Sequence, residues 1–227
     1  MDSVLSMNRK KSKATDYYPI FLNMGGKKCV VAGGGKVALR KVRMLLNYGA
    51  DVTVVSPKAG PEIVKLSEDG LIRLIRRDYE PGDLKDAVIA MACTDMKKVN
   101  RRVAGEAKKA GVLVNVADDS ESSDFIVPSF FRRENLTIAV STSGVSPALA
   151  RKIRAKLEKG LGEEYGSLLS IIGEARSTIR EKGIIVGVEA WQDALDLDLL
   201  IRLVQAGQRE KAKALILNKL RASQRGR

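Results

Sequence analysis

Apolar and polar positions in the first half of the chain follow two alternating periods, which predict strands and helices in turn. Short apolar runs rich in β-branched residues predict strands at 27–33, 51–57, 71–77, 86–94 and 112–118. Apolar residues at helical spacing between them predict helices at 36–49, 60–70 and 95–111. Continuously apolar strands that alternate with helices are typical of a parallel sheet covered on both faces. The predicted fold class is α/β, with a Rossmann-like parallel sheet.

The pattern changes after residue 125. Residues 125–144 predict two short strands of alternating character, and 146–160 predict a helix that Ser146 caps. One face of this helix is an apolar stripe among basic residues, formed by Leu149, Ile153 and Leu157. The stripe fits either core packing beneath a solvated basic face or a partner interface. The remaining chain predicts helices.

Three glycines follow the first predicted strand directly. Gly33-x-Gly35-x-x-Ala38 has the spacing of a dinucleotide-binding turn between a strand and a helix. There, Gly33 allows the tight turn, Gly35 lets the backbone approach a pyrophosphate, and Ala38 permits close helix packing. The N–H groups at the start of the helix then face the phosphates. The alternative is a turn with a purely structural role.

The second predicted strand ends without the acidic residue that binds a ribose hydroxyl in many such folds. Ser56, Pro57 and Lys58 stand there instead. Ser56 can bond a ribose hydroxyl, and Lys58 can attract a 2′-phosphate. These residues leave both NAD and NADP open.

Composition limits which side chains can transfer protons or bind a metal. The chain has 40 Lys and Arg against 27 Asp and Glu, a net charge of +13, and no histidine, so proton transfer falls to other side chains. Cys29 and Cys93 lie inside apolar runs without zinc spacing, which predicts buried reduced thiols and no metal site. An aromatic content of 4% argues against nucleic-acid binding.

No apolar run approaches the roughly 18 residues of a membrane helix. The first 16 residues are polar and basic, without the apolar core of a signal peptide. We therefore expect a cytoplasmic protein with no membrane partner.

Four segments together resemble the precorrin-2 dehydrogenase family, the NAD-dependent module of siroheme synthases. They are PIFLNMGGKKCVVAGGGKVALRKVRMLL, ACTDMKKVNRRV, VNVADDSESSDFIVPS and IAVSTSGVSPALARKIRAKLE, in order between Tyr18 and Leu157. The resemblance implies oxidation of precorrin-2 to sirohydrochlorin with NAD, by an intertwined homodimer. Some members also insert ferrous iron. We expect weak or absent metal insertion from a chain without histidine.

The resemblance also assigns residues. It places the key aspartate on Asp118, with Asp119 and Asp124 as competing carboxylates. Cofactor contacts fall on Gly33, Gly34, Gly35, Lys36, Val37, Pro57, Lys58, Thr94 and Asp95, to which Ser56 is added from its place in the strand. Substrate contacts are expected at Asn115, Ser141, Thr142, Ser143, Arg151 and Arg154. The family generally lacks the acidic ribose residue, which favours NAD over NADP. The tetrapyrrole substrate carries many carboxylates, which gives the positive charge a use.

The predicted organisation has four parts. They are a disordered tail at 1–16, an NAD-binding Rossmann domain at 17–125, a dimerisation region at 126–158 and a helical domain at 159–227. The two short strands lack the area for a core of their own and need a partner surface. Two other classes of function remain as alternatives: a nucleotide-sensing regulatory domain without catalysis, and a basic nucleic-acid-binding protein.

Overall fold

The computed structural model describes residues 17–225 and divides the chain into two compact units, Met1–Val127 and Pro128–Arg227. The tail predicted at 1–16 lies outside the described residues. The second unit contains the predicted helical domain and all but the first two residues of the predicted dimerisation region. The separation of these two parts stays a prediction.

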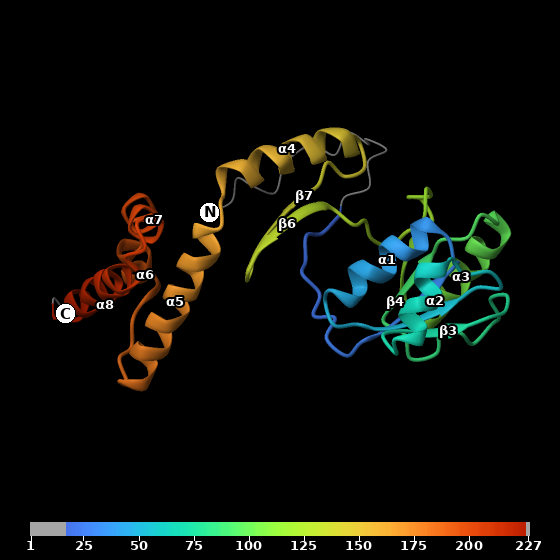
Figure 1. The fold of residues 1–227 in the computed structure, drawn as a ribbon, viewed down its shortest axis with the longest axis horizontal. Coiled ribbons are helices and arrows are strands. Elements are labelled where there is room, and N and C mark those ends of the chain that lie inside the picture. Colours follow the sequence, from blue (N-terminus) through green and yellow to red (C-terminus); the bar gives the residue numbers. More distant parts are fainter. Residues whose placement is uncertain (1–16, 226–227) are drawn as a thin grey trace, which may run out of the picture. The chain divides into compact units, whose positions relative to one another are not determined.

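The first unit is a five-stranded sheet with helices on both faces (Figure 1). Its strands are β1 (Lys28–Ala32), β2 (Asp51–Val55), β3 (Arg73–Ile75), β4 (Ile89–Ala92) and β5 (Leu113–Val116). They lie in the order β3-β2-β1-β4-β5, and every neighbouring pair is parallel. The chain adds strands on one side of β1 and then crosses to the other, so a topological switch point lies between β1 and β4. The predicted Rossmann-like class is confirmed.

Three helices cover this sheet in two layers. They are α1 (Lys36–Leu46), α2 (Pro61–Glu68) and α3 (Lys97–Ala110). Successive residues of β1 point to opposite faces, so Val31 packs in the core with α1 and α2 while Val30 packs in the core with α3. All predicted strands and helices of this unit form, although β4 is shorter than the apolar run at 86–94.

The second unit begins with a hairpin and a helix. Strands β6 (Ser129–Arg133) and β7 (Leu136–Val140) pair antiparallel, and α4 (Pro147–Gly160) packs against both. The Ser146 Oγ atom accepts a hydrogen bond from the Leu149 N–H at 3.2 Å, which confirms the predicted cap.

Four further helices form a separate core in this unit (Figure 1). They are α5 (Glu164–Glu181), α6 (Val188–Ala194), α7 (Leu197–Gln205) and α8 (Arg209–Arg225). Their fully buried side chains include Ile171, Leu200 and Leu220. On their surface, Lys213 and Arg209 contact Glu174 and hold the pKa of its carboxyl below the usual range. None of the helices in the described part of the chain is long and apolar enough to cross a membrane.

Gly33 allows the end of β1 to lie directly against the end of β4. Its φ is +123°, and a Cβ atom there would lie 2.5 Å from the carbonyl oxygen of Cys93. The Gly33 N–H also donates to the carbonyl of Val55 on β2 at 2.9 Å. Only glycine satisfies both the backbone angle and the contact.

We therefore expect Gly33→Ala to lower the free energy of unfolding by at least about 2 kcal/mol, from backbone strain and displacement of the Cys93 carbonyl. Gly105→Ala is the matched control, since Gly105 is exposed inside α3 with open space around it. It should raise stability by about 0.5–1 kcal/mol through helix propensity. Urea unfolding followed by circular dichroism measures the stability of both variants. Equal midpoints would contradict the structural role given to Gly33.

Candidate functional site

The glycine turn leaves an open space at the start of α1. A Cβ atom on Gly34 would overlap the Lys58 carbonyl oxygen, whereas one on Gly35 would meet nothing within 4 Å. Gly35 caps α1 without a side-chain hydrogen bond, and the first turn of α1 contains no acidic residue. The first N–H groups of α1 are therefore available to an anion at the positive end of the helix. This arrangement fits the pyrophosphate of a dinucleotide, with Lys36 and Val37 exposed beside it.

The residues that follow β2 form a closed turn beside Gly34. The Ser56 hydroxyl is buried and donates to the Lys58 carbonyl at 2.7 Å. The Gly60 N–H in turn donates to the Gly34 carbonyl at 2.9 Å. Ser56 therefore fixes the turn with its proton and keeps only acceptor capacity for a ribose. Pro57 and Lys58 are exposed.

A buried asparagine organises the end of β4. The Thr94 hydroxyl donates to Asn100 Oδ1 at 2.7 Å, and Asn100 Nδ2 donates to the Thr94 carbonyl at 2.9 Å. Asp95, the next predicted residue, is exposed. Sequence reasoning missed Asn100. The available signal was its position: Asn100 lies with Val99 and Val103 on the apolar face of the predicted helix, where a polar side chain is buried and needs a hydrogen-bond partner.

Two of the three candidate carboxylates after β5 hold the loop 117–125 in place. Asp119 accepts hydrogen bonds from the Ser122 N–H at 3.1 Å and its hydroxyl at 2.8 Å, which lower the pKa of the Asp119 carboxyl. Asp124 accepts from the Val114 N–H at 3.0 Å, so the loop covers the free edge of β5. Both competitors therefore have structural partners.

Asp118 differs from its neighbours. It has a φ of +59°, a left-handed conformation that aspartate tolerates better than most residues. Its side chain is exposed, and its carboxylate forms no hydrogen bond or ion pair with the rest of residues 17–225. Burial, helped by the charge of Asp118, raises the pKa of the Cys93 thiol to about 11 against the opposing charges of Lys41 and Arg40. Asp118 is thus an unpartnered carboxylate near the end of β4, at the sheet edge that carries the glycine turn.

Both cysteines are free and buried, which confirms the predicted burial of the two thiols. Burial also raises the pKa of Cys29 to about 11. Within the described part of the chain, no three Cys, Asp or Glu side chains are grouped so that they could hold a metal ion.

Asn115 and a lysine that sequence reasoning missed lie beneath this edge. The Lys41 ammonium donates to Asn115 Oδ1 at 2.9 Å, and Asn115 Nδ2 donates to the Phe125 carbonyl at 2.9 Å. Both groups of the Asn115 amide are thus engaged, and its expected substrate contact stays a prediction. The available signal for Lys41 was its position on the same helix face as the buried Ala38 and Leu45, which indicates a lysine directed toward the core.

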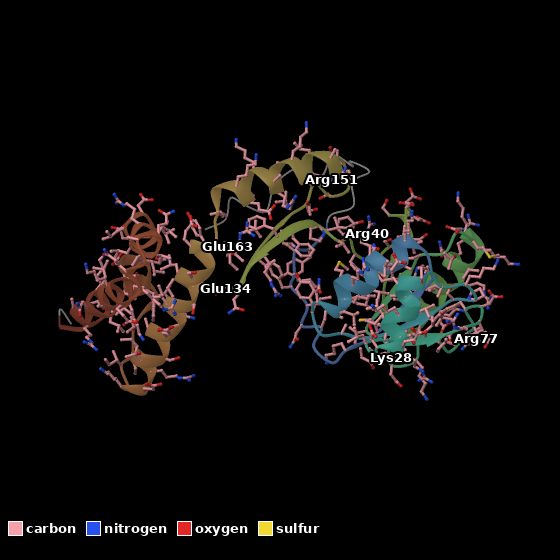
Figure 2. All side chains as sticks on the ribbon, in the orientation of Figure 1. Lys28, Arg40, Arg77, Glu134, Arg151 and Glu163 are labelled. Carbon is pink, nitrogen blue, oxygen red and sulfur yellow. The ribbon has the colours of Figure 1, made fainter. Side chains whose placement is uncertain are left out.

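The other predicted substrate residues lie in the second unit. Ser141 Oγ accepts from the Ser143 N–H at 3.0 Å, and Thr142 Oγ1 accepts from the Ser146 N–H at 3.1 Å, so these hydroxyls shape the turn before α4. Arg154 pairs with Glu158. Arg151 is exposed on α4 and forms no ion pair with any other described residue (Figure 2).

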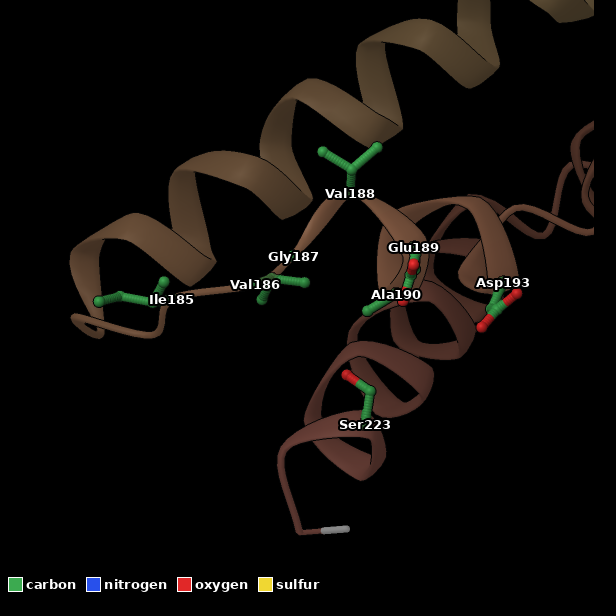
Figure 3. A pocket seen from close by; sticks show the side chains of 8 residues that line it. All are labelled: Ile185, Val186, Gly187, Val188, Glu189, Ala190, Asp193 and Ser223. Atoms are coloured by element: carbon green, nitrogen blue, oxygen red, sulfur yellow. The ribbon is translucent and has the colours of Figure 1, made fainter. Parts of the chain in front are cut away.

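A groove of about 670 Å³ lies elsewhere, between the α5–α6 connection, α6 and α8 (Figure 3). Its lining residues are Ile185, Val186, Gly187, Val188, Glu189, Ala190, Asp193 and Ser223. None of them is a predicted site residue. Its charged groups are two carboxylates, which repel a phosphate or a substrate carboxylate.

Comparisons with known proteins agree with the geometry of the glycine turn. Residues 20–129 match the family described as “Putative NAD(P)-binding”, and residues 133–160 match the family described as “Sirohaem biosynthesis protein central”. Siroheme synthase 1 of Aeromonas salmonicida is 37% identical over 202 residues, which cover 88% of this chain and 43% of that protein. Siroheme synthase of Nitrosococcus oceani is 38% identical over 204 residues, with the same coverage.

A solved structure, “SirC, precorrin-2 dehydrogenase”, is similar with a TM-score of 0.69 and 26% identity, over 91% of this chain and 100% of that one. The chain is thus similar in sequence to siroheme synthases and in fold to a precorrin-2 dehydrogenase. It spans less than half the length of the siroheme synthases it matches. The resemblance seen in the sequence is confirmed, and residues 20–129 form an NAD(P)-binding domain for a nicotinamide cofactor.

Gly35→Asp tests the cofactor site at the glycine turn. The fold has space for the new side chain, but its carboxylate would stand where the pyrophosphate is expected and repel it. We expect nicotinamide dinucleotide affinity to fall at least 100-fold, about 2.7 kcal/mol, with an unchanged circular dichroism spectrum. Calorimetric titration with NAD and NADP measures the loss.

Gly70→Asp supplies the control, since Gly70 lies in a distant turn. Its positive φ of +71° is one that aspartate tolerates. Equal affinity in the wild type and Gly35→Asp would contradict the placement of the cofactor.

Proposed function

We propose that this protein oxidises precorrin-2 to sirohydrochlorin with NAD, as a step in siroheme synthesis. The observation that carries the proposal is the carboxylate of Asp118, which has no partner in the described part of the chain. It lies at the same sheet edge as the glycine turn, where α1 begins without a side-chain cap. Open parallel sheets bind their ligands at this edge, beside the topological switch point. The same reaction is supported by the siroheme synthase relatives and by the structural neighbour named as a precorrin-2 dehydrogenase, which is matched over its whole chain.

The choice of NAD over NADP rests on the resemblance and on the turn after β2. Ser56 accepts hydrogen bonds there without adding charge. Lys58 is the nearby exposed cation that would favour a 2′-phosphate, and it forms no ion pair within the described residues. Turnover with each cofactor in parallel decides between the two.

The reaction removes two electrons and two protons from the substrate. A bound nicotinamide would accept the hydride that a substrate carbon gives up when one of its C–H bonds breaks. The second hydrogen leaves as a proton, which Asp118 accepts and later passes to water. Aspartate is suited to this role here because the chain has no histidine and because Asp119 and Asp124 are engaged in the loop.

A basic helix is proposed to meet the carboxylates of the tetrapyrrole. Arg151 is exposed on α4 and available for a bidentate contact. Arg154 would have to exchange its partner Glu158 for a substrate carboxylate. The net charge of +13 would attract such an anion over a longer range.

We also propose a homodimer that buries one face of α4. Leu149, Ile153 and Leu157 form a stripe along this helix and remain 49%, 38% and 38% exposed. Ala150 is the buried residue of α4. The stripe is therefore not covered by the hairpin, which leaves the partner interface as its use.

Asp118→Asn tests the chemistry directly. Asparagine also tolerates the left-handed conformation but cannot accept the proton. We expect turnover of precorrin-2, followed by nicotinamide absorbance, to fall by about 10²- to 10⁴-fold, with NAD affinity within a few-fold of wild type.

The control for this variant is Glu121→Gln, an exposed carboxylate in the same loop, which should keep wild-type turnover. Asp119 is unsuitable as a control because its carboxylate holds the loop. Near wild-type turnover in Asp118→Asn would assign the proton acceptor elsewhere. Cofactor binding without any turnover by the wild type would favour the regulatory alternative.

Leu149→Asp tests the dimer. Light scattering of the wild type at micromolar concentration should give about twice the chain mass of 24.7 kDa. Leu149→Asp should shift the mass toward the monomer, because a buried carboxylate in the interface is costly. Ala148→Asp is the matched control, since it adds the same charge to the same helical turn, one position away from the stripe. A monomeric wild type, or equal effects of the two variants, would refute the interface.

A further inference from the structure

Lys41 is a lysine of α1 that is directed toward the sheet rather than into solvent. Its ammonium donates to Asn115 Oδ1 on β5 at 2.9 Å, and the described ion pairs do not include it. A half-buried ammonium that is bound to a neutral amide instead of a carboxylate loses solvation without gaining an ion pair. Burial accordingly lowers the pKa of Lys41. Such an arrangement calls for a role that the packing of α1 does not supply.

The amide of Asn115 continues the connection to the loop 117–125. Its Nδ2 atom donates to the Phe125 carbonyl at 2.9 Å, at the end of this loop. Lys41, Asn115 and Phe125 thus link α1, β5 and the segment that begins just before Asp118. The glycine turn is held by a different set of contacts, to the backbone of Val55 and Gly60. The two parts of the site can therefore be disturbed separately.

The charge of Lys41 also reaches the site. The charge of Lys41 lowers the pKa of the Cys93 thiol at the end of β4, and the charge of Asp118 raises this pKa. The thiol therefore lies near both charged groups. Arg40 contributes a further positive charge from the same helix. The loop 117–125 thus lies near the Lys41 ammonium and is also linked to it through Asn115.

We propose that Lys41 is a positioning residue for the dehydrogenation: through Asn115 it holds the loop 117–125 so that Asp118 stays at the carboxyl end of β5. The inference rests on the proposed function. A merely structural lysine would lower stability, cofactor affinity and turnover together. A positioning lysine lowers turnover and leaves cofactor affinity unchanged, because the glycine turn keeps its own contacts.

Lys41→Met removes the ammonium and keeps an unbranched apolar side chain of the length of the lysine methylene chain. We expect kcat for precorrin-2 oxidation to fall roughly 10- to 100-fold, as misplacement of a reacting group does, with the Kd for NAD within twofold. Asn115→Leu breaks the same link and should lower kcat by a similar factor. The double variant should be no worse than either single variant, because the two residues act as one unit.

Arg43→Met is the matched control, since it removes an exposed positive charge from the same helix and should keep wild-type kcat. If Lys41→Met does not fold, Lys41→Gln serves in its place, because its N–H donor is too short to reach Asn115 in the same way. It should show the same loss of kcat with intact NAD affinity.

The outcomes separate this inference from the proposed function. An active wild type with unchanged kcat in the Lys41 variant overturns the inference alone. So does a loss of kcat accompanied by an equal loss of NAD affinity, or fully additive effects of the two single variants. A wild type without turnover with either nicotinamide cofactor overturns the proposed function, and the positioning role with it.

Discussion

Backbone packs directly against backbone where β1 meets α1, and the candidate site depends on this contact. Gly33 lies against the carbonyl of Cys93, and Gly34 lies against the turn that follows β2. A side chain at either position would separate the ends of the three central strands. The close approach brings the turns after β1, β2 and β4 to one edge and leaves the start of α1 uncapped. The helix dipole and its free N–H groups then face outward from the sheet, where an anion can bind.

The loop after β5 solves a second problem at the same edge. β5 has a free side, and Ser123 and Asp124 accept the N–H groups that this side exposes. Fixing the loop in this way uses the carboxylates of Asp119 and Asp124 and leaves that of Asp118 without a partner among residues 17–225. The contacts that close the sheet edge therefore also determine which carboxylate is available for the proposed proton transfer. The left-handed conformation of Asp118 is part of the same turn.

The second unit contributes a different kind of surface. A two-stranded hairpin cannot bury enough apolar area alone, and α4 covers one side of it while its own apolar stripe stays exposed. The helices that follow have a complete core of their own. This helix combines exposed apolar side chains with exposed basic ones. Such a surface suits a segment that binds both a second copy of the chain and an anionic substrate, as proposed here.

Local sequence determined most of the fold. The apolar periods fixed the strands and helices of the first unit, and the spacing of Gly33, Gly35 and Ala38 indicated the cofactor turn, because these signals depend on neighbours in the chain. Tertiary structure alone decided which of three nearby carboxylates is free, since Asp119 and Asp124 are engaged by residues that only the folded loop brings to them. It also placed Lys41 on Asn115, a contact between residues 74 positions apart. Side-chain partners at such separation leave no periodic trace in a single sequence, because the chain must fold before the two atoms meet.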